Sequence, residues 1–432
     1  MSNIVLNRIK VKVENYLSQS QSAYRPGRST SDIVWTHRFL AARVQKFEEE
    51  IYITGIDMSS AFDTIRRSTL IETLQTFLNE DEVRMIRVLL SNTTLEIKTN
   101  NEIPSQPFES NIGSMQGDSL SGCLFDVYFE MSLRELRKEI DSVPIPTEPK
   151  YIASIPKEAI YADDADFINN NPLRKDRIMS IVKESLLKQN LKVNETKTEF
   201  TTLKRGNMNT ENWRNVKKLG SLLGDSEDIL RRKQLSIIAS RKLNQIWIKK
   251  NKVKKEIRIK LYKTIVKSIL IYNSSTWGMT KSQGKILDSF HRKQLRIVLH
   301  VKYPNKINNE DLYKETDEIP LSLTILKGRW RLFGHVLRLH KDTPARKSME
   351  HYFDGSCMKR FNGPQRQTLP VTLHNDLCAT QKVKNIRNKY GVNTFSCPSD
   401  LQKLLLLASD RKRWQQLSED VFEVAQAEKL LQ

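Results

Sequence analysis

The stretch YADDADF, residues 161–167, places two adjacent aspartates between apolar, strand-forming flanks. Successive side chains of a strand point to opposite faces of its sheet, so a regular strand would separate the two charges. At a turn, both aspartates can face one side. The apolar runs 160–162 and 165–168 therefore predict a β-hairpin with Asp163 and Asp164 at its tip. An ordinary acidic turn is the alternative, because aspartate is a favoured turn residue.

A third carboxylate ends another apolar run. IYITGID (51–57) indicates a strand that finishes at Asp57. If this strand lies beside the hairpin, Asp57 comes close to Asp163 and Asp164, and such a cluster needs a cation to offset its repulsion. Oxygen ligands suit Mg²⁺ or Mn²⁺, and two such ions can clamp an in-line phosphoryl transfer. Spacing alone leaves the point open, because 106 positions separate Asp57 from Asp163.

The pattern of strands and helices changes along the chain. Strands alternate with helices over about the first 205 residues, and the pattern beyond about residue 228 is almost wholly helical. We expect helices at 1–20, 123–137 and 175–190, strands at 51–57 and 197–203, and paired strands at 95–100 and 106–112. The expected fold class is α+β, with a helical appendage.

Positive charge is concentrated in the first part of this helical region. The chain has a net charge of +21, and residues 229–300 hold 19 lysines and arginines against two acids, Glu256 and Asp288. Such a concentration favours a polyanionic partner, and nucleic acid is the commonest one. The alternatives are a solvated helix face or a nuclear-targeting run, above all for the densest stretch, 249–260.

The sequence contains no sign of secretion or of a membrane span. The four cysteines form no CxxC pair, which suits a reducing, intracellular setting. No apolar run approaches the length of a membrane-spanning helix, and the N-terminus does not resemble a signal peptide.

The order of motifs along the chain points to a family. QSAYRPGRSTSD, GIDMSSAFDTI, GSMQGDSLSGCLFDVYF, YADDADFI, LKVNETKTEF and KKLGSLLG follow one another between about residues 4 and 225. This series resembles the reverse transcriptases of non-LTR (LINE-like) retrotransposons. The resemblance implies a right-hand polymerase palm, an antiparallel sheet with packed helices, followed by a helical thumb and a mainly α C-terminal region. The implied divisions are 1–50 (part of the fingers), 51–228 (palm and fingers), 229–300 (basic thumb) and 301–432.

The resemblance assigns roles to residues around the carboxylates. Asp57 matches the first metal-binding aspartate of the palm, and Asp163 and Asp164 match the aspartate pair of the catalytic hairpin. Phe62 matches the aromatic residue under the incoming sugar, where a ring would exclude a ribose 2′-hydroxyl. Lys197 matches a lysine that could protonate or stabilise the leaving pyrophosphate. The alternatives are an ordinary core residue for Phe62 and a surface lysine for Lys197.

Two further residues match the block that lines the nucleotide and template pocket. They are Gln116 and Gly117, and the glycine would let the backbone approach a base closely. This block departs from the commonest family form at two positions. Asp118 stands where a small or polar residue is usual, and Gly122 stands where proline is usual.

Other matches concern contacts with nucleic acid. Arg25 and Arg28 match a basic loop that could contact template phosphates, with a helix-capping context as the alternative. Leu219 and Gly220 resemble the primer-grip turn. The expected duplex-binding lysines of the thumb are Lys249, Lys250, Lys252, Lys254 and Lys255.

The C-terminal region gives weaker signals. Residues 325–340 resemble a recurrent C-terminal segment of these elements, in which Trp330 and Phe333 could stack on bases or pack in a core. Some relatives carry a zinc knuckle. Here the spacing of Cys357, His374, Cys378 and Cys397 is too wide for that motif, so we do not expect zinc.

These matches lead to two principal hypotheses. The first is an RNA-directed DNA polymerase that uses two Mg²⁺ ions (Mn²⁺ possible), an RNA template, a DNA primer, their RNA–DNA duplex and dNTPs, without a membrane. The second is a catalytically inactive nucleic-acid-binding remnant of the same fold, because no basic, RPI-like fingers stretch precedes Gln21 and no endonuclease is recognisable. A fragment that does not fold stably is a third. The expected location is intracellular, with a nuclear phase during integration or a cytoplasmic ribonucleoprotein.

Overall fold

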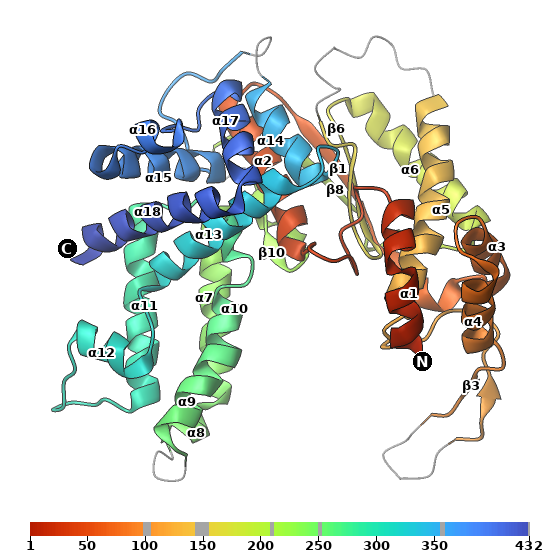
Figure 1. Ribbon diagram of the computed structural model, residues 1–432, viewed down its shortest axis with the longest axis horizontal. Helices are drawn as coiled ribbons and strands as arrows, with labels where there is room; N and C mark the ends of the chain where they lie inside the picture. Colours follow the sequence, from red (N-terminus) through yellow and green to blue (C-terminus); the bar gives the residue numbers. More distant parts are fainter. Residues whose placement is uncertain (98–104, 143–154, 208–210, 249–252, 355–358, 431–432) are drawn as a thin grey trace. The chain divides into compact units, whose positions relative to one another are not determined.

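The computed structural model describes residues 1–97, 105–142, 155–207, 211–248, 253–354 and 359–430 (Figure 1). The chain folds into two compact units. Unit 1 comprises Met1–Ile33, Glu50–Thr202 and Asp342–Pro344, and unit 2 comprises Val34–Glu49, Leu203–Lys341 and Ala345–Gln432.

Unit 1 is organised around a four-stranded sheet in the order β5-β6-β1-β8. Its strands are β1 (Ile51–Ile56), β5 (Glu158–Tyr161), β6 (Asp164–Asn169) and β8 (Glu199–Leu203). β5 and β6 form the hairpin predicted from YADDADF, and β6 also pairs antiparallel with β1. The pairing of Ile56 with Ala165 brings the end of β1 beside the start of β6, as the sequence predicted for Asp57.

Helices of unit 1 bury a shared apolar core. They are α1 (Ser2–Tyr16), the 3₁₀ helix η1 (Ala61–Thr64), α3 (Arg67–Gln75), α4 (Glu80–Leu90), α5 (Ser121–Ser142) and α6 (Pro172–Lys188). Val5, Ile9 and Val13 recur at helical spacing and turn one face of α1 into this core, which includes Phe125 of α5 and Val182 of α6. The predicted helices 1–20, 123–137 and 175–190 are thus confirmed within a few residues.

Three short antiparallel pairs complete the strand inventory of the described residues. β2 (Met58–Ser59) pairs with β7 (Lys192–Val193), β3 (Thr94–Leu95) with β4 (Phe108–Glu109), and, in unit 2, β9 (Lys217–Lys218) with β10 (Ser221–Leu222). The predicted pairing of 95–100 with 106–112 is confirmed at β3 and β4, and residues 98–104 lie outside the described part. The strand predicted at 197–203 is β8.

Unit 2 is almost entirely helical. α2 (Thr30–Lys46) enters it at Val34. The 3₁₀ helix η4 (Asn212–Asn215) and the β9–β10 pair then precede α7 (Asp225–Lys242), α8 (Asn244–Ile248), α9 (Lys255–Leu261), the π-helical turn η5 (Tyr262–Lys267), α10 (Ser268–Leu270), η6 (Ser274–Thr276), α11 (Lys281–Leu299), α12 (Asn309–Thr316), α13 (Leu321–Arg338), α14 (Pro344–Phe353), α15 (Leu369–Lys384), α16 (Ile386–Tyr390), α17 (Pro398–Ser409) and α18 (Arg411–Leu430).

An aromatic core closes the C-terminal part of unit 2. Trp330 stacks on Trp414 with ring centroids 5.6 Å apart, and Phe333 packs against Trp35, Phe395 and Trp414. Trp330 and Phe333 are both buried, so the core interpretation holds for them and base stacking does not. The mixed α+β class predicted from the sequence is confirmed, with small antiparallel sheets and a predominance of helix. Across the described residues, no helix combines the length and apolarity needed to cross a membrane.

Candidate active site

The β5–β6 hairpin closes through a two-residue turn, Ala162–Asp163, because Tyr161 pairs with Asp164. Ala162 has φ +54°, in the left-handed region that non-glycine residues seldom occupy. A positive φ at the first central residue lets a two-residue turn follow the twist of the strands. The turn that carries Asp163 therefore has an uncommon backbone conformation, held by its surroundings.

Asp57 lies close enough to Asp163 to influence the ionisation of Asp163. Asp57 directly follows β1, which pairs with β6 beside the turn. Burial raises the pKa of Asp163 above its usual range and the Asp57 carboxylate raises it further, while a backbone hydrogen bond and Lys197 oppose the rise. The site thus brings two carboxylates and one lysine together from segments far apart in the sequence.

Lys197 reaches Asp57 from the loop that follows β7. The Asn194 N–H donates to the Asp57 carbonyl (2.8 Å), and the Lys197 N–H donates to the Asn194 carbonyl (3.2 Å). These bonds place Lys197 Nζ 3.3 Å from Asp57 Oδ2, with the lysine side chain 66% exposed. Within the described residues no cation forms an ion pair with Asp163, so this exposed lysine faces two carboxylates.

This arrangement fits a divalent cation at Asp57 and Asp163. Asp57 Oδ2 is buried and accepts no hydrogen bond from the described part of the chain, so the ion pair with Lys197 lacks hydrogen-bond geometry. Carboxylate oxygens without donors, in a site of net negative charge, are ligands that Mg²⁺ and Mn²⁺ accept. Asp164 is exposed at the first position of β6. The described residues contain no group of three or more acidic, histidine or cysteine side chains placed to hold a metal.

Tyr24, which lies near Asp163, belongs to a group of three aromatic rings with Phe62 and Phe125. Phe62 stacks on Phe125, with centroids 4.4 Å apart and planes 18° apart, and meets the edge of Tyr24 at 6.3 Å. Tyr24 is 59% exposed, and after burial the acids Asp126 and Asp163 contribute to the rise of its pKa. Phe62 is half-buried, so both of its interpretations, substrate contact and core, remain compatible with its position.

Gly122 explains one departure from the family form. A Cβ atom at this position would lie 2.5 Å from the Tyr24 ring. Any side chain here would displace Tyr24, because real Cβ atoms do not approach that closely. The missing side chain therefore makes room for the tyrosine.

The predicted nucleotide and template loop packs against the segment that holds Phe62. The Ser114 N–H donates to the Phe62 carbonyl (2.9 Å), which fixes the start of the loop. Gln116 and Gly117 are exposed, and Gly117 has φ +95°, which favours glycine. Asp118 Oδ2 accepts from the Leu120 N–H (3.3 Å), so the second departure from the family form closes a local turn directly before α5.

Arg25 and Arg28 bind groups of unit 1 itself. The buried Arg25 donates to both carboxylate oxygens of Glu14 through Nε, and to the Ser18 and Gln21 carbonyls through Nη1. Arg28 is half-buried and donates to Gln19 Oε1 (2.6 Å). The Arg25 guanidinium is therefore engaged inside the protein rather than turned to solvent.

Gln21 is the site residue that sequence reasoning missed. Its side chain is buried and its Oε1 accepts from the Ser22, Ala23 and Ala162 N–H groups. The sequence offered one signal, since Gln21 opens the motif QSAYRPGRSTSD. A contact spanning 141 positions cannot be read from that motif.

Comparison with known proteins decides the family. The family model described as reverse transcriptase (RNA-dependent DNA polymerase) matches residues 1–257, more than half of the chain.

This chain belongs to the reverse transcriptase family.

Solved telomerase structures are also similar to this chain. The telomerase of Candida tropicalis in complex with a TWJ fragment of telomeric RNA has 11% identity and a TM-score of 0.42, over 94% of this chain and 56% of that one. The telomerase of Candida albicans with the same kind of fragment has 11% identity and a TM-score of 0.40, over 81% and 52%. The apo telomerase of Candida tropicalis truncated from its C-terminal domain has 17% identity and a TM-score of 0.36, over 48% and 41%. The chain spans about half the length of these telomerases.

In unit 2, the residues predicted as the primer grip form a second tight turn. Leu219 and Gly220 connect β9 to β10 and have φ +44° and +78°. Tyr272 Oη donates to the Leu219 carbonyl (3.1 Å), and Arg231 Nη1 donates to the Gly220 carbonyl (2.7 Å). The turn is thus held by groups of the predicted thumb.

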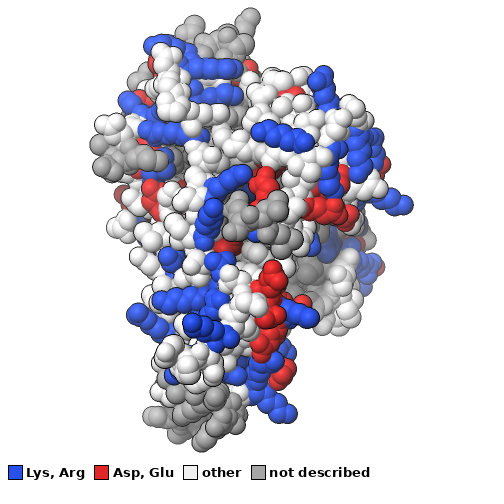
Figure 2. Space-filling model, turned by 90° about the vertical axis from the view of Figure 1, so that its left-hand side faces the viewer, with Lys and Arg blue, Asp and Glu red and all other residues white. Residues whose placement is uncertain are grey.

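The structure describes two of the five lysines predicted to bind a duplex, Lys254 and Lys255. Lys249, Lys250 and Lys252 lie outside the described residues. Lys254 is the N-cap residue of α9, and Lys255 Nζ lies 3.1 Å from Glu315 Oε1. Figure 2 shows lysine and arginine side chains spread over one face in several groups, with acidic side chains gathered between some of them.

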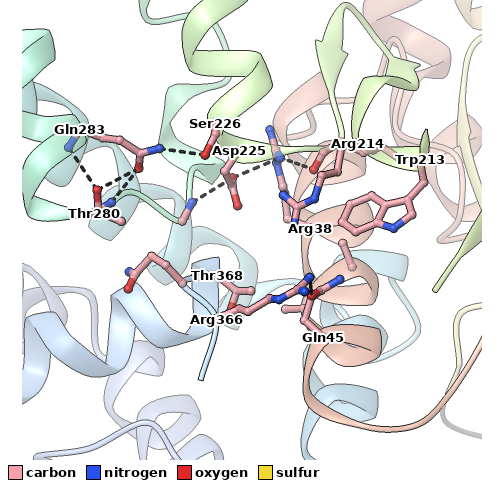
Figure 3. A pocket seen from close by; sticks show the side chains of 15 residues that line it. Arg38, Gln45, Trp213, Arg214, Asp225, Ser226, Thr280, Gln283, Arg366 and Thr368 are labelled. Atoms are coloured by element: carbon pink, nitrogen blue, oxygen red, sulfur yellow. Dashed lines mark hydrogen bonds and ion pairs between the residues drawn. The ribbon is translucent and has the colours of Figure 1, made fainter. Parts of the chain in front are cut away.

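A cavity of about 170 Å³ within unit 2 is lined by three arginines, Arg38, Arg214 and Arg366 (Figure 3). Each pairs with a carboxylate. Arg38 Nη1 lies 3.1 Å from Asp225 Oδ1. Arg214 Nε and Arg366 Nη1 lie 2.5 Å from the two carboxylate oxygens of Glu211. These arginines are therefore neutralised by their own acids.

Among the described residues, the cysteines and the histidine considered for zinc do not come together as a group of three or more ligands. Cys357 lies outside the described residues. Cys378 Sγ lies 3.4 Å from His374 Nε2, and Cys397 Sγ lies 3.0 Å from Ser399 Oγ.

Proposed function

We propose that this chain is the RNA-directed DNA polymerase of a non-LTR retrotransposon and acts by two-metal nucleotidyl transfer. The observation that carries the proposal is the grouping of Asp57, Asp163 and Lys197 at the β5–β6 turn of a chain that belongs to the reverse transcriptase family. The order of its motifs, quoted above, supports the non-LTR subtype.

Asp57 and Asp163 would hold the divalent cations, with Asp164 as a further ligand at the same turn. The ions, when bound, would activate the attacking primer hydroxyl and steady the leaving pyrophosphate. Asp57 offers a buried oxygen without a hydrogen-bond donor, and burial, together with the charge of Asp57, raises the pKa of Asp163, so a second negative charge there is costly. A cation removes that cost.

Lys197 would supply a proton to the leaving group. Its ammonium lies at the carboxylates but is largely exposed, so it can turn from Asp57 toward a pyrophosphate without unfolding any element. Phe62 would restrict the sugar. Its ring is fixed against Phe125, which gives a rigid surface suited to excluding a 2′-hydroxyl.

The partners we propose are an RNA template, a DNA primer and dNTPs. The basic region 229–300 would hold the duplex as a thumb, since its charge suits phosphate contacts. Gln116 and Gly117 are exposed in the loop that begins at Ser114, whose N–H binds the Phe62 carbonyl, and would contact the nucleotide and template. Residues 51–228 would then act as palm and fingers.

Primer extension on poly(rA)–oligo(dT) with Mg²⁺ or Mn²⁺ tests the proposal. The full chain should extend the primer, and Asp163→Asn should not, although its salt-sensitive binding of the duplex should remain. Asp63→Asn is the matched control, because Asp63 is an exposed carboxylate that follows Asp57 by six positions. If the folded parent binds the duplex but does not extend it, the chain is instead a non-catalytic nucleic-acid-binding form of the fold.

A further inference from the structure

A side chain from the N-terminal segment binds the turn that carries Asp163. Ala162 occupies the left-handed region at φ +54°, which costs an alanine free energy that a glycine would not lose. Such a conformation persists only when contacts with neighbouring groups hold the backbone in it.

Gln21 binds the main-chain N–H of Ala162. Its Oε1 accepts from that N–H (3.1 Å), while its Nε2 lies 3.5 Å from the Ala162 carbonyl. The same Oε1 accepts from Ser22 N–H (2.9 Å) and Ala23 N–H (3.0 Å). One amide oxygen thus ties three backbone groups together, and one of them belongs to the residue before Asp163.

The segment around Gln21 is itself an added edge beside β5. The Ser22 N–H donates to the Ile160 carbonyl (2.9 Å), and the Ile160 N–H donates to the Ser20 carbonyl (3.1 Å). Arg25 then anchors this segment, because it donates to the Gln21 carbonyl (2.9 Å) and is paired with Glu14 of α1. Gln21 is 1% exposed, so water does not compete for its amide.

We infer that Gln21 is a positioning residue that sets the backbone of Asp163 and so the direction of its carboxylate. The inference rests on the proposed function, in which Asp163 holds a metal ion. A displaced metal ligand lowers both ion affinity and reaction rate, because the reacting groups must meet within a few tenths of an ångström. Arg25, which the sequence assigned to template contact, acts here as a support of Gln21.

The test compares Gln21→Met with the parent chain. Methionine keeps the volume of the side chain and removes the acceptor. We expect primer extension to fall about a hundredfold with the KM for dTTP nearly unchanged, and Mn²⁺ affinity, measured by electron paramagnetic resonance, to fall about tenfold. Gln21→Glu keeps the acceptor oxygen, so it should retain more primer extension and more Mn²⁺ affinity than Gln21→Met. Gln19→Met is the matched control, since Gln19 binds Arg28 and not the turn.

A second variant separates positioning from general stability. Ala162→Gly accepts the left-handed conformation without help, and glycine is the preferred residue at the first position of such a turn. When Ala162→Gly is added to Gln21→Met, the Mn²⁺ affinity or the extension rate should rise at least tenfold above that of Gln21→Met. This rise is expected even if Gln21→Met also lowers the melting temperature. Unchanged Mn²⁺ binding in Gln21→Met, or no rescue by Ala162→Gly, overturns the inference. A parent that binds Mn²⁺ but does not extend primers refutes the polymerase proposal and leaves the Mn²⁺ comparison decisive for Gln21.

Discussion

One carboxylate site in each unit of this protein shows how acids can be balanced in opposite ways. In unit 2, Glu211 accepts hydrogen bonds from Arg214, Arg366, Gln45 and the Gly206 N–H. Burial alone would raise the pKa of Glu211, but these bonds outweigh it and lower the pKa. In unit 1, burial and Asp57 raise the pKa of Asp163, and Lys197 offsets this only in part.

The difference separates a structural cluster from a site prepared for a ligand. A buried acid surrounded by its own arginines has its charge matched in the folded protein. The Asp57 and Asp163 carboxylates have a charge that the fold leaves partly unmatched, so a cation gains from binding there. The same substitution, carboxylate to amide, should therefore have opposite consequences in the two places.

The largest expected effect is on catalysis by Asp57→Asn. The amide preserves the shape but removes a proposed metal ligand, so primer extension should fall about a thousandfold or more, equivalent to about 4 kcal/mol in the activation free energy. The melting temperature should not fall, because the variant removes a repulsion. The measurement is single-turnover extension alongside thermal unfolding. A rate within tenfold of the parent would remove Asp57 from the active site.

Glu211→Gln is the matched change in unit 2. It leaves Arg214 and Arg366 without their carboxylate in a buried setting, so the free energy of unfolding should fall by about 3 kcal/mol. Chemical denaturation measures this loss. Extension by the folded fraction should stay near the parent rate. A loss below about 1 kcal/mol would show that the cluster in unit 2 is not balanced as described.

Lys197→Met sharpens the comparison because its two effects have opposite signs. Loss of a proton donor should slow extension about a hundredfold. Loss of the ammonium that competes for Asp57 should leave Mn²⁺ binding equal or tighter. Electron paramagnetic resonance and extension assays on the same preparation test both signs. Weaker Mn²⁺ binding would contradict the competition between lysine and metal.

The smallest expected effect comes from Gly122→Ala. The new Cβ would meet the Tyr24 ring at 2.5 Å and displace it from the edge of Phe62. An edge-to-face pair contributes about 1 kcal/mol, and this pair supports Phe62, the ring proposed to contact the sugar. The KM for dTTP should therefore rise about fivefold. In a Tyr24→Ala background the same substitution should add no further effect. An equal additional increase there would show that Gly122 acts by another route.

The sequence predicted those parts of the site that depend on local pattern. The apolar runs on both sides of Asp163 and Asp164, and the apolar run that ends at Asp57, were enough to predict the hairpin and a separate strand. Partners far away in sequence could not be predicted in this way. Arg25 turns to Glu14 and Gln21 turns to Ala162 because of how the N-terminal segment lies against β5. Trp330 is buried because Trp414 stacks on it, and a contact with a residue so distant in sequence cannot be predicted from the local pattern.

The response of the melting temperature to Mn²⁺ tests the central contrast most directly. A ligand that binds only the folded state stabilises it in proportion to the logarithm of its concentration over its dissociation constant. The full chain and Glu211→Gln should both gain about 3 °C or more in saturating Mn²⁺, and Asp57→Asn should gain nothing. An equal gain in Asp57→Asn would contradict the account, because the ion would then bind elsewhere.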